Sequence, residues 1–409
     1  MSATGAKHDR DNLRHKVQMR HNSPLEVDLL MLSKMRKGRT VLICLSVLIA
    51  GLAFKNFSAA QAPPNKPPFQ GDPDNLDRVD GTRGPVDLNL MDPALVGAID
   101  IHEHLGPGPR YTDQKMGIDV FDEAKLAKRR GMRGFVFKSH LDGSSAAAAY
   151  LIRSHVEPTL EVFGRMPLNF TVGGINIAAV DEFTQVQGGW GRIIEMPTMD
   201  APCPCGPDKT RDAPPGSEDA QRESYNRRWA FLMPPGSPKL VAISKDHELL
   251  PEVKRLIGLM AKMVTVDSSG RLALGTGHST GEEDLLLARE GRKVGLQVTC
   301  PHCWGDMNPT QLQEYVKLGA FLEMRHNSVS ADLVRKIGAE HIIASTDCGF
   351  MNNPFPPDCL AIMAQKLRAG GITERQIDTM FKENPAKLLG LSPWRQAAEP
   401  SEASVGRNQ

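Results

Sequence analysis

Residues 99–104 read Ile99-Asp100-Ile101-His102-Glu103-His104, and Leu-Gly-Pro-Gly-Pro follows. The two β-branched isoleucines favour a strand, which the glycines and prolines end. Because successive side chains of a strand point to opposite faces, His102 and His104 project from the same face. Two imidazoles side by side at the end of a strand provide half of a metal site. A pair of histidines on a solvated loop is the alternative, so this interpretation depends on the rest of the chain.

The segment at 99–104 is the first of eight apolar segments that alternate with segments of helical composition. The expected strands are 99–104, 133–140, 160–169, 192–198, 272–278, 296–302, 320–326 and 341–347. Eight strand–helix units over about 300 residues predict an α/β fold, a (β/α)8 TIM barrel. A doubly wound open sheet would alternate in the same way, but the count of eight and the lack of a GxGxxG motif or P-loop favour the barrel.

Helix boundaries are predicted from caps and glycines. Thr280 with Glu283 and Thr373 with Gln376 fit capping boxes at helix starts. Glycine often follows the last turn of a helix, and four helices are expected to end at Gly131, Gly291, Gly319 and Gly338.

The amino-terminal segment, 1–62, has the pattern of a secretory signal peptide with an extended leader. Lysines and arginines at 34–39 precede the apolar run 41–54, and small residues follow at 58–62. A membrane anchor is the alternative. The fourteen residues of the apolar run would rise about 21 Å as a helix, short of the ~30 Å hydrocarbon core, so cleavage is favoured.

Three further segments are expected after the leader. Residues 63–87 are rich in Pro, Gly, Asn and Asp and predict an exposed linker or arm. The barrel should occupy 88–393, with a lid-like insertion after strand four at 199–240, where Pro, Gly, Cys and charged residues gather. The polar end, 394–409, predicts a disordered tail.

The charge balance of the chain excludes some partners. The formal net charge is +1, but residues 1–62 hold ten lysines and arginines against four acids, which leaves 39 against 44 in the rest. A mildly acidic body has no basic surface for nucleic acid or an anionic membrane. We expect a small-molecule substrate, export to the periplasm or secretion, and no stable membrane insertion after cleavage. Whether the chain forms a homo-oligomer stays open.

Removal of the leader leaves six cysteines, at 203, 205, 300, 303, 348 and 359. An even number in an exported chain permits disulfides. Cys348 and Cys359 flank a proline-rich loop after strand eight, and we expect them to pair.

Titratable residues gather at the carboxyl ends of the predicted strands, where barrels of this class carry their catalytic groups. They are His102, His104, Lys138, His140, His278, Cys300, His302 and Asp347. Histidine nitrogens and a carboxylate oxygen suit a borderline divalent cation such as Zn²⁺. The sequence therefore predicts a centre of one or two metal ions at the mouth of the barrel.

This arrangement resembles the amidohydrolase superfamily of metal-dependent barrel hydrolases, over about 95–391. The likeness rests on the HxH pair, the histidines after strands five and six, Asp347 and the closing helix at 384–391, Asn-Pro-Ala-Lys-Leu-Leu-Gly-Leu. Through 131–140 and 344–347 the chain looks most like a poorly characterised branch.

The resemblance implies metal-assisted attack of water on an amide, ester or lactone-like bond of a small molecule. It also implies that His102, His104, His278 and one strand-six residue are ligands. Asp347 would touch the metal and take a proton from the water. A turn cap before Gly349 is the alternative for Asp347.

Two departures from the superfamily's pattern leave alternatives open. Binuclear members bridge their metals through a carboxylated lysine or a glutamate on strand four, where this chain offers only Glu195; its prominent lysine, Lys138, is on strand two. Lys138 could be a carboxylated ligand, a clamp for a substrate carboxylate or a strand-end charge, and His140 a ligand or a substrate contact. On strand six, Cys300 stands where the superfamily has histidine; either its thiolate or His302 is the ligand, and we favour His302.

Other interpretations belong to different classes of protein. Cys300-Pro-His-Cys303 matches the active-site tetrapeptide of exported thioredoxin-fold disulfide oxidoreductases. In those enzymes the CxxC motif lowers the pKa of a cysteine thiol. That motif belongs near the start of a small domain, ahead of a helix. A barrel that only binds a ligand is a third interpretation. Glu323 and Arg325 share one face of strand seven and are expected to pair, and His341 is expected to be structural, at the far end of strand eight.

Overall fold

The structure, a computed structural model, describes residues 87–108, 116–139, 142–201, 232, 234, 236–238, 240–351 and 353–394. The predicted leader, nearly all of the linker and the tail, most of the lid-like segment, His140, Cys203 and Cys205 lie outside these residues. Those predictions stay predictions. Within the described ranges, no helix is both long and apolar enough to cross a bilayer.

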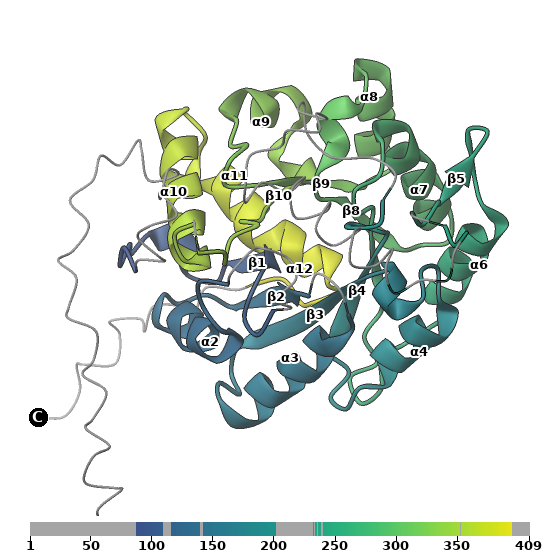
Figure 1. Ribbon diagram of the computed structural model, residues 1–409. Coiled ribbons are helices and arrows are strands. Elements are labelled where there is room, and N and C mark those ends of the chain that lie inside the picture. Colours follow the sequence, from purple (N-terminus) through teal and green to yellow (C-terminus); the bar gives the residue numbers. More distant parts are fainter. Residues whose placement is uncertain are drawn as a thin grey trace, which may run out of the picture. The chain divides into compact units, whose positions relative to one another are not determined.

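Eight parallel strands form one sheet in which neighbours follow chain order (Figure 1). They are β1 (Ile99–Glu103), β2 (Gly134–Lys138), β3 (Glu161–Pro167), β4 (Gly191–Glu195), β7 (Ala273–Gly275), β8 (Gln297–Cys300), β9 (Phe321–Met324) and β10 (Ile342–Ala344). Each lies within or next to a predicted segment. The short β5 (Ser244–Lys245) and β6 (Glu248–Leu249) form a separate hairpin.

The sheet closes between its first and last strands through the segment that follows β10. The Asp347 amide donates to the His102 carbonyl over 2.9 Å, and the His104 amide donates to the Cys348 carbonyl over 2.8 Å. The Asp100 carboxylate accepts a hydrogen bond from the Thr346 hydroxyl over 2.5 Å. The predicted (β/α)8 barrel is therefore confirmed.

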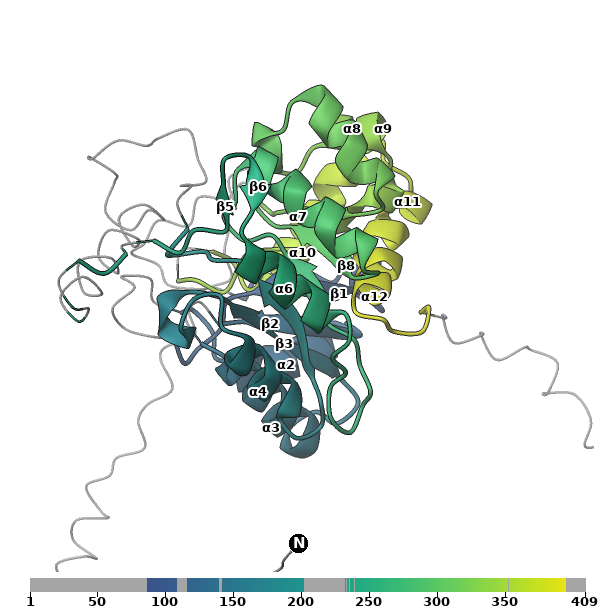
Figure 2. The same cartoon turned by 90° about the vertical axis from the view of Figure 1, so that its right-hand side faces the viewer.

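Helices follow most of the strands and cover the outside of the barrel (Figures 1 and 2). They are α2 (Val120–Arg129), α3 (Ser144–His155), α4 (Ile177–Gln185), α6 (Pro251–Met260), α7 (Gly281–Lys293), α8 (Pro309–Lys317), α9 (Ala331–Ile337), α10 (Pro356–Ala369), α11 (Glu374–Asp378) and α12 (Asn384–Leu388). Both predicted capping boxes are present, at Thr280 and Thr373. A π-helical turn (Thr379–Glu383) joins α11 to α12.

One predicted helix end is wrong. Gly291 lies inside α7, and the chain leaves this helix at Gly295, whose φ is +86°. A Cβ atom on residue 291 would lie 2.8 Å from Val298 Cγ2. Gly291 thus permits close packing of α7 on β8. The other three glycines follow their helices with positive φ, as expected: Gly131, Gly319 and Gly338.

The half of the barrel interior nearer the amino-terminal ends of the strands is apolar; we call it the lower half. Side chains from the strands meet there with Ala386 and Leu388 of α12, which lies across the centre of the strand ring (Figure 1). The strand residues are Ile99, Ile101, Val136, Phe163, Ile193, Ala273, Phe321 and Ile343. Polar interior residues therefore lie above this layer, toward the carboxyl ends of the strands.

β1 contains an irregularity that simple alternation does not predict. Its register with β2 shifts between Asp100 and Glu103, as at a β-bulge. Ile99 and Ile101 pack in the apolar interior, yet the ring of His102 also lies inside the barrel. A bulge re-aims the side chains that follow it. One strand thus supplies both part of the apolar floor and the first histidine above it.

The predicted disulfide is present. Cys348 follows Asp347, and its sulfur is bonded to that of Cys359 in the first turns of α10. Both residues are buried. The bond ties the segment that closes the barrel mouth to the helix behind it.

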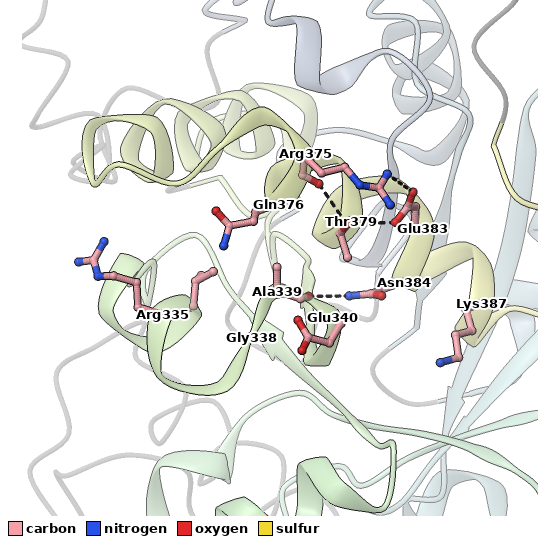
Figure 3. A pocket seen from close by; sticks show the side chains of 11 residues that line it. Arg335, Gly338, Ala339, Glu340, Arg375, Gln376, Thr379, Glu383, Asn384 and Lys387 are labelled. Atoms are coloured by element: carbon pink, nitrogen blue, oxygen red, sulfur yellow. Dashed lines mark hydrogen bonds and ion pairs between the residues drawn. The ribbon is translucent and has the colours of Figure 1, made fainter.

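A surface pocket lies beside the amino-terminal end of β10 (Figure 3). Its charged side chains are partly paired with each other, since Arg375 contacts Glu383 at 2.5 Å. The Asn384 amide donates to the Ala339 carbonyl over 2.8 Å. None of the predicted site residues lines this pocket.

Candidate metal centre

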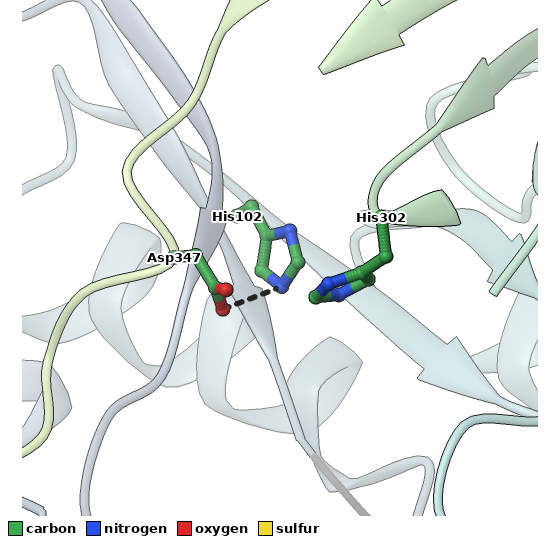
Figure 4. A group of neighbouring side chains, drawn as sticks. All are labelled: His102, His302 and Asp347. Carbon is green, nitrogen blue, oxygen red and sulfur yellow. Dashed lines mark ion pairs between the residues drawn. The ribbon is translucent and has the colours of Figure 1, made fainter. Parts of the chain in front are cut away.

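Three predicted residues meet at the carboxyl ends of the strands (Figure 4). His102 extends from β1, His302 follows β8 and Asp347 follows β10. Each offers one ligand atom, and these atoms lie within 4.8 Å of one another. His102 Nε2 is 3.2 Å from Asp347 Oδ1.

Two more predicted histidines border this group. His104 Nε2 lies 3.0 Å from Asp347 Oδ1 and 3.2 Å from His102 Nε2. The ring centroid of His278 is 4.4 Å from that of His302. The structure therefore brings together the five residues that were expected at the mouth on strands one, five, six and eight.

The backbone fixes Asp347 in an uncommon conformation. Its φ is +57°, in the left-handed region that favours glycine. The hydrogen bonds that join this segment to β1 hold it there, next to the histidines. Such conformations cost of order 1–3 kcal/mol and occur mainly where surrounding structure enforces them, often at functional sites.

Arg325 holds the other oxygen of Asp347. Its Nη1 donates to Asp347 Oδ2 over 3.0 Å. Burial alone would raise the pKa of Asp347, but His102, with a further hydrogen bond from His104, holds that pKa well below its usual value. Asp347 is therefore a carboxylate at neutral pH. Arg325 does not pair with Glu323, so that prediction is wrong: Glu323 points down into the interior and binds Arg165 instead.

Lys138 lies inside the cluster rather than at its edge. Its Nζ is 3.2 Å from His102 Nε2 and 3.2 Å from Glu195 Oε2. Arg165 binds the other oxygen of Glu195 over 2.7 Å. Burial would raise the pKa of Glu195, but the two cations lower it to about 2. Glu195 thus balances buried positive charge below the histidines.

The donor set fits a divalent cation. Both ring nitrogens of His302 are buried and have no hydrogen-bond partner among the residues that the structure describes. Burial lowers the pKa of His302 well below its usual value, so the ring is neutral and has a lone pair to offer. Two imidazole nitrogens and a carboxylate oxygen suit Zn²⁺ or a similar ion.

Cys300 does not join the cluster. It is fully buried on the helix-facing side of β8, and its thiol contacts Asp284 of α7 at 3.2 Å. Burial raises its pKa well above the ordinary value, which is the opposite of what a reactive CxxC cysteine needs. This position favours His302 over the Cys300 thiolate as the ligand and argues against the disulfide-oxidoreductase interpretation.

Other predicted residues lie elsewhere. His341 stands just before β10, at the opposite end of that strand from Asp347, with Glu340 at 3.8 Å. His140 lies outside the described residues.

Sequence reasoning missed the polar layer directly below the cluster, to which Arg165 and Thr299 contribute. Arg165 is fully buried and binds both Glu195 and Glu323. Its signal was a charged residue at the inward parity of β3, two positions after Phe163.

The fold is similar to several solved structures. They include a PTE-like lactonase from Deinococcus radiodurans, determined as a multiple mutant (14% identity, TM-score 0.43, covering 73% of this chain and 97% of that one). An organophosphorus hydrolase from the same organism has 14% identity and a TM-score of 0.40 (73% and 93% covered). An amidohydrolase from Burkholderia multivorans with bound zinc has 8% identity and a TM-score of 0.44 (72% and 99% covered). At these values the chemistry of those proteins does not transfer to this chain.

Comparison by sequence gives a family. Among curated proteins, none matches the chain. The profile of a family of unknown function, DUF6282, matches residues 97–323. The match begins at Gly97, just before β1, and ends at Glu323 on β9. Because this match covers more than half of the sequence and seven of the eight barrel strands reach into it, the chain belongs to the DUF6282 family.

Proposed function

We propose that this protein is a metal-dependent hydrolase of the amidohydrolase type, acting on an amide, ester or lactone-like bond of a small molecule. The convergence of His102, His302 and Asp347 carries the proposal, since three ligand atoms meet within 4.8 Å. His104 and His278 border them and complete the candidate ligand set. The nitrogen and oxygen donors favour Zn²⁺, as one ion or two.

The residues of the cluster have separable roles. A divalent cation bound there would supply Lewis-acid polarisation and water of lowered pKa, near 7 instead of about 15.7. Asp347 is ionised at neutral pH, so it can accept a proton from the attacking water and pass it to the leaving group. Arg325 holds Oδ2 of Asp347, which leaves Oδ1 facing the histidines.

Lys138 is best described as a charged group within the centre. Its ion pair with Glu195 favours an ammonium over a carboxylated lysine, which would place a second anion next to Glu195. A buried ammonium beside His102 can attract an anionic substrate group. We therefore favour the clamp role for Lys138.

The test measures metal and activity in the same preparations. The full chain is reconstituted with Zn²⁺, assayed for metal content by mass spectrometry and screened against small esters, lactones and amides. His102→Ala and His302→Ala should lose metal and activity together. His341→Ala, which removes a histidine at the other end of the barrel, is the matched control and should lose neither.

Asp347→Asn separates the proton acceptor from the ligands. The amide keeps the size and one oxygen but cannot accept a proton at neutral pH, so this variant should keep most of its metal and lose about 10²–10⁴-fold in rate. A fully metallated Asp347→Asn chain with the parental rate would show that Asp347 is only a turn cap. A chain that binds zinc but hydrolyses no member of the panel would favour the ligand-binding barrel.

A further inference from the structure

Glu323 lies directly behind the first histidine of the centre. It extends from β9 into the interior and is fully buried. Its Oε2 is 2.9 Å from His102 Nδ1 and accepts a hydrogen bond from Ser345 Oγ over 3.2 Å. Its Oε1 accepts from Arg165 and from Thr299, each over 3.0 Å. All four neighbours act as donors toward this carboxylate.

The contact with Glu323 decides where His102 carries its proton. An ionised carboxylate only accepts hydrogen bonds, so Nδ1 of His102 must be the protonated nitrogen. Binding a cation requires the neutral ring, and in that form the lone pair is on Nε2. That atom faces the centre, 3.2 Å from Asp347 Oδ1 and 3.2 Å from His104 Nε2.

We infer that Glu323 is a positioning residue for the metal centre: it fixes the ring of His102 with its proton on Nδ1, so that Nε2 presents a lone pair to the cation. This inference rests on the proposed function, because it assigns a role in holding the metal. Carboxylates behind metal-binding histidines orient the ring and raise its basicity, and their loss typically costs 10–100-fold in affinity.

The surroundings of Glu323 make Glu323→Gln a directional test. A glutamine has one accepting oxygen and one NH2 group, and arginine has no acceptor at all. The amide oxygen must therefore face Arg165, which directs the NH2 group toward His102 and Ser345. The Ser345 hydroxyl can rotate to accept. His102 can accept only by moving its proton from Nδ1 to Nε2, and then no lone pair faces the centre.

Thr299→Val is the matched control. It removes one donor to Glu323 at nearly constant volume, on the oxygen that does not face His102. Like Glu323→Gln, this variant weakens the hydrogen bonding of the buried layer, but it leaves the contact between Glu323 and His102 in place. The tautomer of His102 and the zinc affinity should stay as in the parent chain.

The experiment reads the tautomer and the metal affinity separately. Histidine-labelled protein, freed of metal with a chelator at about pH 8, is examined by long-range ¹H–¹⁵N correlation. Zinc affinity is then measured by competition with a chromophoric chelator. We expect the Nδ1–H form of His102 in the parent and in Thr299→Val. We expect the Nε2–H form in Glu323→Gln, with zinc affinity reduced 10–100-fold.

Two outcomes would overturn the inference. The first is a parent chain whose His102 carries its proton on Nε2, a result that needs no variant to fold. The second is a folded Glu323→Gln chain with the parental tautomer and zinc affinity. A parent chain with the Nδ1–H form that binds no zinc would instead overturn the proposed metal centre, so the two failures are distinguishable.

Discussion

Arg165 joins two buried carboxylates, and its removal should strongly destabilise the barrel. Its guanidinium lies 2.7 Å from Glu195 Oε1 and 3.0 Å from Glu323 Oε1, and all three side chains are fully buried. Arg165→Met keeps most of the apolar volume and removes only the charge and the donors.

The two carboxylates lose different amounts of support in this variant. Glu195 keeps Lys138 at 3.2 Å, whereas Glu323 keeps hydrogen bonds but no directly paired lysine or arginine. Breaking a buried ion pair by removing one partner typically costs 3–5 kcal/mol, because an uncompensated charge stays buried. We expect Arg165→Met to lower the free energy of unfolding by about 3–5 kcal/mol, a large part of the 5–15 kcal/mol typical of a domain.

Arg289→Met is the matched control, with the same substitution at the surface. Arg289 binds Glu314 through two hydrogen bonds of 2.6 and 2.8 Å, but the two side chains are 49% and 39% exposed. Exposed pairs contribute about 0.2–1 kcal/mol. Urea unfolding of the parent chain and of both variants, all free of metal, gives the free energy of unfolding of each. An m-value shared by the three chains makes these free energies comparable. Equal losses in the two variants, or a loss below 1 kcal/mol for Arg165→Met, would refute the reasoning.

Three further predictions concern pH, the disulfide and the leader. Burial raises the pKa of Asp284 to about 8, so the folded chain keeps a proton that the unfolded chain loses above about pH 4. The free energy of unfolding should therefore fall with rising pH across that window, and Asp284→Asn should remove the contribution of this group, at most ~1.4 kcal/mol per unit. Asp100, whose pKa burial raises to about 7, adds its own slope in both chains; a slope in urea titrations that Asp284→Asn leaves unchanged contradicts the prediction. Replacing Cys348 and Cys359 by serine should lower the free energy of unfolding by about 2–3 kcal/mol in the same assay, and parental stability argues against the bond. Mass spectrometry of protein from the producing cell should find a mature chain that begins near Gln61 or Pro63; an intact leader refutes export.

The strand ends could be predicted because parallel strands buried on both faces form short apolar runs that polar residues interrupt. The observed strands are shorter than the predicted ones. β10 covers only Ile342–Ala344, and β8 ends at Cys300. Asp347 and His302 therefore stand beyond the last paired residues, where the backbone turns. For this reason strand alternation could not decide between Cys300 and His302.

The interior polar layer could not be predicted from one sequence. Alternation places Glu323 and Arg325 on one face of β9, but it does not say at which height of the barrel each side chain finds a partner. Glu323 lies within β9, at the level of Arg165 of β3. Arg325 lies just beyond the carboxyl end of β9, at the level of Asp347. The first pairing crosses the barrel interior, and the second joins the ends of the neighbouring strands β9 and β10, so neither leaves a local signal. The bulge in β1 likewise depends on register with β2.

The buried layer below the histidines is balanced in charge without any metal. Arg165 and Lys138 supply two positive charges, and Glu195 and Glu323 supply two negative ones. The barrel interior therefore does not need a cation to compensate it, unlike small zinc domains that unfold without metal. We expect the chelator-treated chain to keep its circular dichroism spectrum and cooperative urea unfolding while losing hydrolysis. Loss of cooperative unfolding on chelation would show that the cation holds the fold together and not only the chemistry.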